Sequence, residues 1–218
     1  SYLPLDSELP AERLQAMLED AAPRFVLADA HVSDSLRRLD AAHGFDIIEV
    51  TADGGGMPPG AVPELSDLAR PEHVAYLIFT SGSTGTPKAA QLTHGGLANH
   101  VRWMRHTLAL TANDRVLHKT SSSFDASLCE FFPPLASGAQ VILAPPDAHR
   151  DMHRLVATLH AEAASVVQFV PSELRVALDE ALMARCTALR FVLCGGEALD
   201  RDLALAFQRR LPATRLGN

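Results

Sequence analysis

The stretch that decides the fold is VAYLIFTSGSTGTPK, residues 74–88. Residues 74–79 form an apolar run bounded by turn residues, which predicts a strand buried on both faces. Residues 80–88 are rich in hydroxyls and glycines and end on Lys88. Glycines let the backbone approach a ligand closely, and consecutive N–H groups and a lysine attract phosphate oxygens. The segment is therefore interpreted as a phosphate-binding loop.

This segment does not match the Walker A pattern, which needs four residues between its glycines and a Lys-Ser/Thr pair after them. Here the lysine is followed by Ala89. An ordinary Ser/Gly-rich surface loop between two strands is the alternative interpretation. The lysine and the buried strand before the loop favour phosphate.

The composition of the 218 residues, 47% apolar and 21% charged, is that of a globular chain. A net charge of −7 without a basic stripe argues against nucleic acid as a partner. Neither a membrane-length apolar stretch nor a signal peptide is visible, so we expect no membrane partner. Three widely spaced cysteines do not indicate a disulfide framework, which favours a reducing cytoplasm. We also expect a monomer. His149 and His153 lack a third ligand at a known spacing, so we predict no zinc site.

The first half of the chain gives a mixed pattern of predicted elements. We expect helices at 10–20 and 34–40, strands at 25–28 and 45–50, an irregular segment at 51–66, and a helix capped by Thr93 that runs to about residue 108.

From residue 111 onward, strands and helices alternate regularly. Strands are expected at 116–118, 141–143, 166–170, 191–194 and from 215, with helices at 126–135, 152–162, from 171, and at 200–210. This alternation predicts an α/β fold with a mostly parallel sheet flanked by helices. Ligands of such sheets bind where strands end, which here means residues 80 onward, 119–125, 171–172 and 195–197.

Three motifs, in this order and separation, carry a family resemblance: residues 80–88, SFDAS at 123–127 and GGEAL at 195–199. They resemble the adenylation domains of nonribosomal peptide synthetases, the amino-acid-activating branch of the adenylate-forming superfamily. Similar family segments are YLPLD at 2–6, PAERL at 10–14, VLHKT at 116–120, EFF at 130–132, GA at 138–139, HRD at 149–151 and FVPS at 169–172. The resemblance covers essentially the whole chain.

The resemblance implies that residues 1–218 are part of the large N-terminal subdomain of such an enzyme. Within it we expect an N-terminal part at 1–66 with the irregular linker 51–66, a phosphate-loop strand and helix at 67–110, and a flavodoxin-like substrate-pocket subdomain at 111–218.

The implied reaction is ligation of an α-amino acid to AMP at the expense of ATP. Mg²⁺ accompanies the ATP, pyrophosphate is released, and the acyl group passes to the phosphopantetheine of a carrier protein. Neighbouring synthetase domains complete this secondary metabolite pathway. By resemblance, the phosphates are bound by Thr80, Ser81, Gly82, Ser83, Thr84, Gly85 and Lys88, of which Thr84 and Lys88 are the catalytic candidates. Gly195, Gly196, Glu197 and Ala198 would line the adenine, although a plain helix-entry turn also explains the two glycines.

Asp125 is expected to pair with the α-ammonium group of the substrate, a charge-assisted contact. Its alternative role is to cap a helix that begins at Ala126, and both roles can hold together. Phe124 would border the carboxylate. The family's pocket positions map to Asp125, Ala126, Cys129, Gln168, Val192 and Cys194.

Two of these pocket residues suggest what the substrate side chain is. Cys129 stands where the family often has a large aromatic residue, which predicts a deeper pocket; as with Cys194, the alternative is a small buried core residue. Gln168 is expected to be a buried polar group in need of a partner. A medium or large side chain with a hydrogen-bonding group is therefore the hypothesis for the substrate.

Two departures from the family bear on activity. Ala89 replaces a family glycine, and the chain ends at Asn218, before the family's magnesium-binding glutamate, ribose-binding aspartate, hinge, and C-terminal lid with its catalytic lysine. We therefore expect the principal Mg²⁺ ligand beyond residue 218 and a catalytically incompetent fragment of an active parent. Two alternatives remain: another acyl- or aryl-acid ligase, against which Asp125 argues, and a non-catalytic nucleotide- or amino-acid-binding module.

Overall fold

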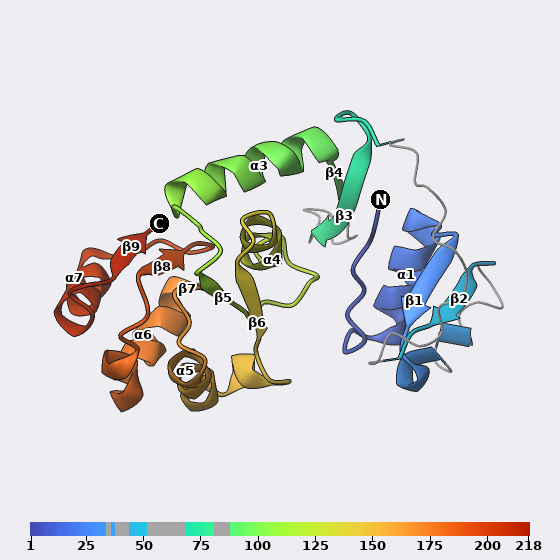
Figure 1. Cartoon of the computed structure of the whole chain (residues 1–218). Helices are drawn as coiled ribbons and strands as arrows, with labels where there is room; N and C mark the ends of the chain where they lie inside the picture. Colours follow the sequence, from blue (N-terminus) through green and yellow to red (C-terminus); the bar gives the residue numbers. More distant parts are fainter. Residues whose placement is uncertain (34–35, 38–43, 52–68, 81–87) are drawn as a thin grey trace. The chain divides into compact units, whose positions relative to one another are not determined.

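The computed structural model describes residues 1–33, 36–37, 44–51, 69–80 and 88–218 (Figure 1). They form two units, Ser1–Leu97 and Ala98–Asn218, each of which is described by itself. The finer division at residues 66 and 110 stays a prediction. None of the described helices is both long and apolar enough to cross a membrane.

The first unit opens with helix α1 (Ala11–Ala21), which follows Pro10. Its buried face, Met17 and Leu18, is supplied by the 3–4 spacing of apolar residues. Strands β1 (Phe25–Ala28) and β2 (Asp46–Glu49) form a parallel pair. Leu18 and Val26 join Ala28, Leu36 and Phe45 in a small core. The predicted helix at 34–40 lies largely outside the described residues.

Strand β3 (Val74–Thr80) is the predicted apolar strand, but its partner β4 (Lys88–Thr93) is antiparallel and was not predicted. Thr80 and Lys88 are register partners at the ends of these strands. Ala89, the residue that replaces a family glycine, pairs with Phe79 inside β4. A regular strand accommodates a Cβ atom, so this alanine causes no strain there.

Helix α3 (His94–Thr107) begins where predicted. The hydroxyl of Thr93 accepts a hydrogen bond from the Gly96 N–H at 3.2 Å, which confirms Thr93 as the capping residue.

The second unit is a parallel five-stranded sheet in the order β6-β5-β7-β8-β9. The predicted α/β fold and parallel sheet are confirmed. Its elements are β5 (Arg115–His118), α4 (Ser127–Leu135), β6 (Gln140–Leu143), η1 (Ala148–Arg150), α5 (Met152–Ala161), β7 (Val166–Phe169), α6 (Pro171–Asp179), η2 (Ala181–Arg185), β8 (Phe191–Cys194), α7 (Arg201–Arg210) and β9 (Arg215–Gly217).

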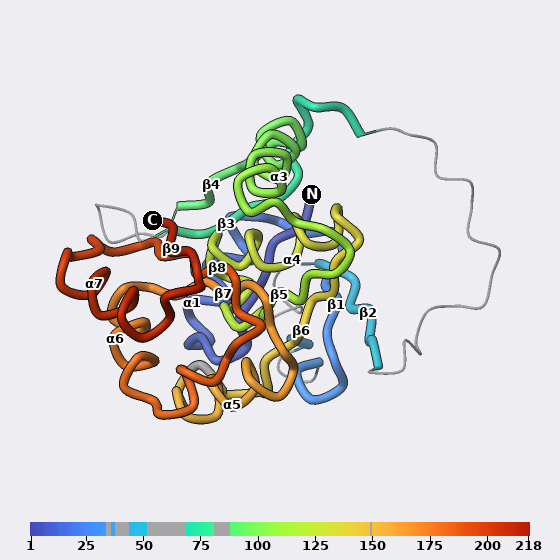
Figure 2. Tube along the Cα trace, turned by 60° about the vertical axis from the view of Figure 1, so that its left-hand side comes forward, coloured from blue at the N-terminus to red at the C-terminus, as the bar shows by residue number. Residues whose placement is uncertain are grey.

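The two faces of this sheet carry different cores, because side chains alternate along each strand. Leu117, Val167, Phe169, Val192 and Cys194 face a large buried cluster built with α5, α6 and α7. Val116, Val166 and Phe191 face the other way, against Met104 of α3, with Cys129 of α4 and Leu193 at the margin. Figures 1 and 2 show α5 to α7 gathered on one side of the strands and α4 on the other.

The beginnings of the strands are joined by a buried ionic network. Asp114, just before β5, accepts hydrogen bonds from Arg190 at 2.7 Å, from Ser165 at 2.8 Å and from the Thr111 N–H at 2.8 Å. Burial alone would raise the pKa of Asp114, but these donors and the Arg190 charge lower it to about 2. This network holds the edge of the sheet opposite the strand ends where ligands are expected.

Candidate active site

The connection from β5 to α4 is organised by one buried carboxylate, Glu130. Its Oε2 accepts hydrogen bonds from the backbone N–H groups of Lys119 and Thr120 at 3.0 and 2.9 Å and lies 2.8 Å from His118 Nδ1. Its Oε1 accepts the Thr120 hydroxyl at 2.6 Å. A helix residue thus fixes the end of β5. Sequence reasoning placed Glu130 in a family segment but gave it no role, because only the fold brings the groups together.

Asp125 lies on this connection, just before α4, and is exposed. Its carboxylate has no hydrogen-bond or ion-pair partner among the described residues, although its charge raises the pKa of the nearby Cys129. The predicted capping role is wrong: Ala126 is the N-cap residue of α4, and no side chain caps that helix. Asp125 instead takes part through its backbone carbonyl, which accepts the Leu128 N–H at 3.0 Å. The carboxylate is therefore available to a ligand.

Phe124 is also exposed, at 64% of its surface. Its carbonyl accepts the hydroxyl of buried Ser127 at 2.7 Å, so the turn that carries Phe124, Asp125 and Ala126 is anchored to the helix. The ring is free to contact a bound molecule.

Cys129 lies in the first turn of α4 and contacts a residue that the sequence did not single out. Its Sγ lies 3.2 Å from Nε2 of His100, on α3. Burial, followed by the negative charges of Glu130 and Asp125, raises the pKa of Cys129 to about 11, so the thiol is protonated at neutral pH. No sequence spacing links positions 100 and 129, so this contact was not predictable.

Gln168 lies on β7, on the sheet face that α3 and α4 cover, because its neighbours Val167 and Phe169 face the opposite cluster. Its register partner on β8 is Leu193. The amide Oε1 of Gln168 is buried and has no hydrogen-bond partner among the residues that the structure describes. The expectation of a buried polar group in need of a partner is thus met.

Val192 and Cys194 are not brought to this face. Both are almost fully buried, at 0% and 2% exposure, in the cluster under α5 to α7. Leu193 occupies the position beside Gln168 and, like Cys129, packs against the cluster that contains Val116 and Val166. Side chains alternate between the two faces of a strand, so positions one residue apart face opposite ways. The residues of this segment on the Gln168 face are therefore Leu193 and, just past the strand end, Gly195, in place of the predicted Val192 and Cys194.

The segment after β8 carries the predicted adenine residues. An added Cβ at Gly195 would meet no atom within 4 Å, so the surface above this residue is open. Gly196 has a φ of 82°, a conformation that favours glycine. Glu197 is tied to α6, since its carboxylate accepts the Ser172 N–H and hydroxyl, both at 2.9 Å. Ala198 is exposed beside it.

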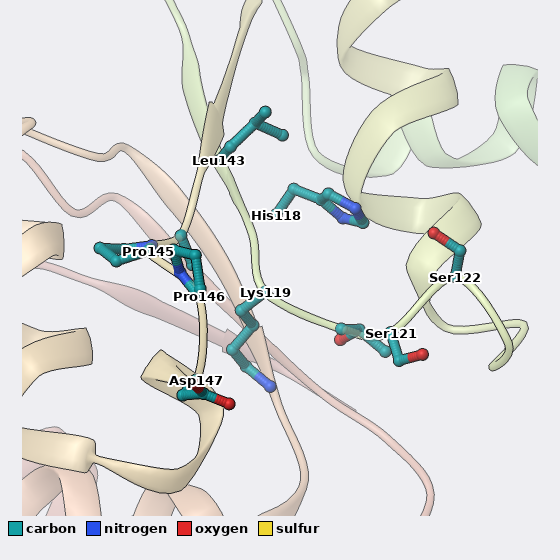
Figure 3. Close-up of a pocket in the computed structure, with 10 residues that line it drawn as sticks. His118, Lys119, Ser121, Ser122, Leu143, Pro145, Pro146 and Asp147 are labelled. Carbon is teal, nitrogen blue, oxygen red and sulfur yellow. The ribbon is translucent and has the colours of Figure 1, made fainter. Parts of the chain in front are cut away.

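A pocket of about 320 Å³ opens at the ends of β5 and β6, lined by residues 118–122 and 143–147. Figure 3 shows the side chains of His118 and Lys119 pointing in different directions within it. The Lys119 ammonium binds both oxygens of Glu173 on α6, at 3.1 and 2.8 Å, and lies 5.6 Å from the centre of the Phe169 ring. Lys119 therefore ties β5 to α6 rather than offering a free charge.

In the first unit, Thr80 and Lys88 are both exposed, and the Thr80 hydroxyl donates to the Lys88 carbonyl at 3.3 Å. The other predicted phosphate-binding residues, Ser81, Gly82, Ser83, Thr84 and Gly85, lie outside the described residues. Across the described ranges no group of three or more His, Cys, Asp or Glu side chains is placed to hold a metal ion.

The AMP-binding enzyme family matches residues 1–218. Tyrocidine synthase 3 of Brevibacillus parabrevis is 40% identical over 207 residues, which are 95% of this chain and 3% of that protein. Enterobactin synthase component F of Escherichia coli O157:H7 is 36% identical over 213 residues, 96% of this chain and 16% of that protein. The chain thus spans a small part of the length of these relatives.

Solved structures give the same result. The nonribosomal peptide synthetase FmoA3 superposes with a TM-score of 0.86 and 29% identity over 99% of this chain and 22% of that chain. Its forms bound to AMPPNP and to α-methyl-L-serine-AMP give TM-scores of 0.85 and 0.84. The resemblance to nonribosomal peptide synthetases expected from the sequence is confirmed. By the match of the family to its whole length, the chain belongs to the AMP-binding enzymes.

Proposed function

We propose that this chain is part of a ligase that joins an α-amino acid to AMP. The carboxylate of the amino acid attacks the α-phosphate of ATP, the bond to the β-phosphate breaks, and pyrophosphate leaves. The aminoacyl group is then transferred to the thiol of a carrier protein's phosphopantetheine arm, next to neighbouring synthetase domains.

The observation that carries this proposal is the exposed carboxylate of Asp125, which has no partner within the part of the chain that the structure describes. It lies close enough to Cys129 for its charge to act on that thiol, and Cys129 packs against the core on the α4 side of the sheet. A carboxylate without a partner suits an ammonium group, and charge-assisted hydrogen bonds of this kind are among the stronger ones. A ligase for acids without an amino group has no use for this charge.

Residues in each of the two units, considered separately, support the binding of a nucleotide. In the second unit, the open surface above Gly195 and the strand-end turn at Gly196 suit the close approach of a flat ring such as adenine. In the first unit, Lys88 brings a positive charge to the strand end beside Thr80, which suits phosphate. The FmoA3 form with AMPPNP supports ATP as the nucleotide.

Magnesium is proposed to accompany ATP, where it neutralises phosphate charge. Since the described residues contain no cluster that fits a metal, no step is assigned to a protein ligand for it.

The test is amino-acid-dependent exchange of labelled pyrophosphate into ATP by the full-length enzyme that contains this chain. We expect exchange with one or a few amino acids and a tenfold to hundredfold loss of kcat/KM in Asp125→Asn, since hydrogen bonds to charged groups contribute about 1.5–3 kcal/mol. Asp179→Asn, a change at an exposed aspartate at the end of α6, is the matched control and should leave the rate unchanged.

Other results would select the alternatives. Equal exchange with carboxylic acids that lack the amino group would indicate an acyl- or aryl-acid ligase. Binding of ATP or an amino acid without any exchange would indicate a binding module.

A further inference from the structure

The connection between β8 and α7, residues 195–200, is held from outside by hydrogen bonds near its start and in its middle. The Gly195 N–H donates to the carbonyl of Phe169, at the end of β7, at 3.2 Å. Both carboxylate oxygens of Glu197 accept hydrogen bonds from Ser172, one from its backbone N–H and one from its hydroxyl, each at 2.9 Å. These contacts fix the connection against the β7–α6 segment.

Helix α6 also holds the far end of this connection. Arg175 forms an ion pair with Asp200 at 2.6 Å, and Asp200 accepts the Leu203 N–H at 2.7 Å as the N-cap residue of α7. Ser172 and Arg175 are three residues apart, so they lie on the same side of α6. One side of a single helix therefore carries both the middle and the end of the connection.

The first turn of α6 is itself anchored to the sheet. Glu173 binds the ammonium group of Lys119 with both oxygens, at 3.1 and 2.8 Å, and accepts the Val170 N–H at 3.1 Å. The Lys119 side chain is only 6% exposed, so water screens this ion pair less than it screens a surface pair. Ser172 therefore donates its hydrogen bonds from a fixed support.

The contacts of Glu197 leave the neighbouring glycines, rather than the carboxylate, to meet a flat ring. An added Cβ at Gly196 would lie 3.3 Å from Val170 Cγ1, so this position faces the start of α6. An added Cβ at Gly195 would meet no described atom within 4 Å, so a ligand can approach the backbone there. The carboxylate of Glu197, in contrast, is directed to Ser172.

We propose that Ser172 is a positioning residue for the nucleotide. It holds Glu197 so that the backbone at Gly195 and Gly196 meets the adenine ring, and Glu197 acts on ATP through this hydrogen bond rather than by contact with the base. The inference rests on the proposed function. It adds a role for Ser172 and replaces the contact with adenine that the family resemblance implied for the Glu197 side chain.

The experiment is pyrophosphate exchange by the full-length enzyme, with KM measured separately for ATP and for the preferred amino acid. We expect Ser172→Ala to raise the KM for ATP about threefold to tenfold, the size of one lost hydrogen bond, with kcat and the KM for the amino acid unchanged. Ser172→Thr keeps the hydroxyl and should restore the KM. Thr158→Ala is the matched control, because it removes an exposed hydroxyl that donates to the Arg154 carbonyl at 2.9 Å on α5.

Two further measurements distinguish positioning from direct contact. Because hydrogen-bond partners are energetically coupled, Ser172→Ala combined with Glu197→Ala should raise the KM for ATP no more than Glu197→Ala alone. Purine riboside triphosphate lacks the 6-amino group, which is the donor that a carboxylate in contact with adenine would bind. Glu197→Ala should therefore raise the KM for this analogue by the same factor as the KM for ATP.

The outcomes separate the inference from the proposed function. The inference alone would be overturned by an unchanged KM for ATP in Ser172→Ala, even with a loss of stability in urea unfolding. Additive effects of the two substitutions would also overturn it, as would an effect of Glu197→Ala that is seen with ATP and absent with the analogue. Absence of exchange with every amino acid in the wild type would overturn the proposed function and the inference with it.

Discussion

Removal of the Glu130 carboxylate should strongly destabilise the second unit. Glu130 is 1% exposed, and its two oxygens serve four donors on the connection after β5. Glu130→Ala would leave the N–H groups of Lys119 and Thr120 and the ring of His118 without their acceptor. An unsatisfied buried donor costs about 1–3 kcal/mol, and loss of one partner of a buried ionic group costs about 3–5 kcal/mol. We therefore expect a loss of about 3–5 kcal/mol.

Urea unfolding followed by the fluorescence of Trp103 measures this change, because Trp103 is the only tryptophan and lies on α3 in the second unit. Glu162→Gln is the matched control, since its ion pair with Arg115 is exposed and should contribute less than about 1 kcal/mol. A loss below about 1 kcal/mol in Glu130→Ala would refute the view that this carboxylate organises the connection carrying Asp125.

Three further predictions concern acid stability, backbone conformation and thiol chemistry. Because the pKa of Asp114 in the folded chain is about 2, its ionised form contributes about 2 kcal/mol of stability above pH 4. This contribution is half lost by pH 3 and fades as the pH falls through 2. The difference in unfolding free energy between wild type and Asp114→Asn, measured by urea unfolding from pH 6 to 2.5, should therefore shrink as the pH falls. Gly196→Ala should cost about 1–2 kcal/mol, since φ is 82° and the new Cβ would lie 3.3 Å from Val170 Cγ1, whereas Gly195→Ala meets no atom and should be near neutral in the same assay. Cys129, with a pKa raised to about 11, should alkylate slowly with iodoacetamide at pH 8, as followed by mass spectrometry; rapid labelling would contradict the protonated thiol.

The parallel sheet of the second unit was predictable because its strands are continuous apolar runs separated by amphipathic helices. Val166–Phe169 and Phe191–Cys194 were placed to within a residue. Strand β4 was missed because its sequence, KAAQLT, has weak strand propensity and no alternation; its pairing with β3 supplies the stability.

The sequence indicated which residues to consider for the site, but not on which face of the sheet each side chain lies or what it contacts. The binding roles of Asp125 and Gln168 stay predictions. The choice between Val192 and Leu193 depends on which face of the sheet each side chain occupies, and a family motif does not fix this to one residue. The predicted capping role of Asp125 is wrong because α4 begins at Ser127, one residue later than the sequence suggested, which makes Ala126 the N-cap residue. The contact between His100 and Cys129 joins two helices and has no local signal.

In the proposed function, the enzyme adenylates the carboxylate of an amino acid whose α-ammonium group binds Asp125. The most direct measurement is hydroxylamine trapping of the acyl-adenylate by the full-length enzyme, with its preferred amino acid and with the same acid lacking the α-amino group. We expect hydroxamate from the amino acid alone, with the discrimination between the two acids reduced tenfold to a hundredfold in Asp125→Asn. Equal yields from both acids, or discrimination that is unchanged in Asp125→Asn, would contradict it.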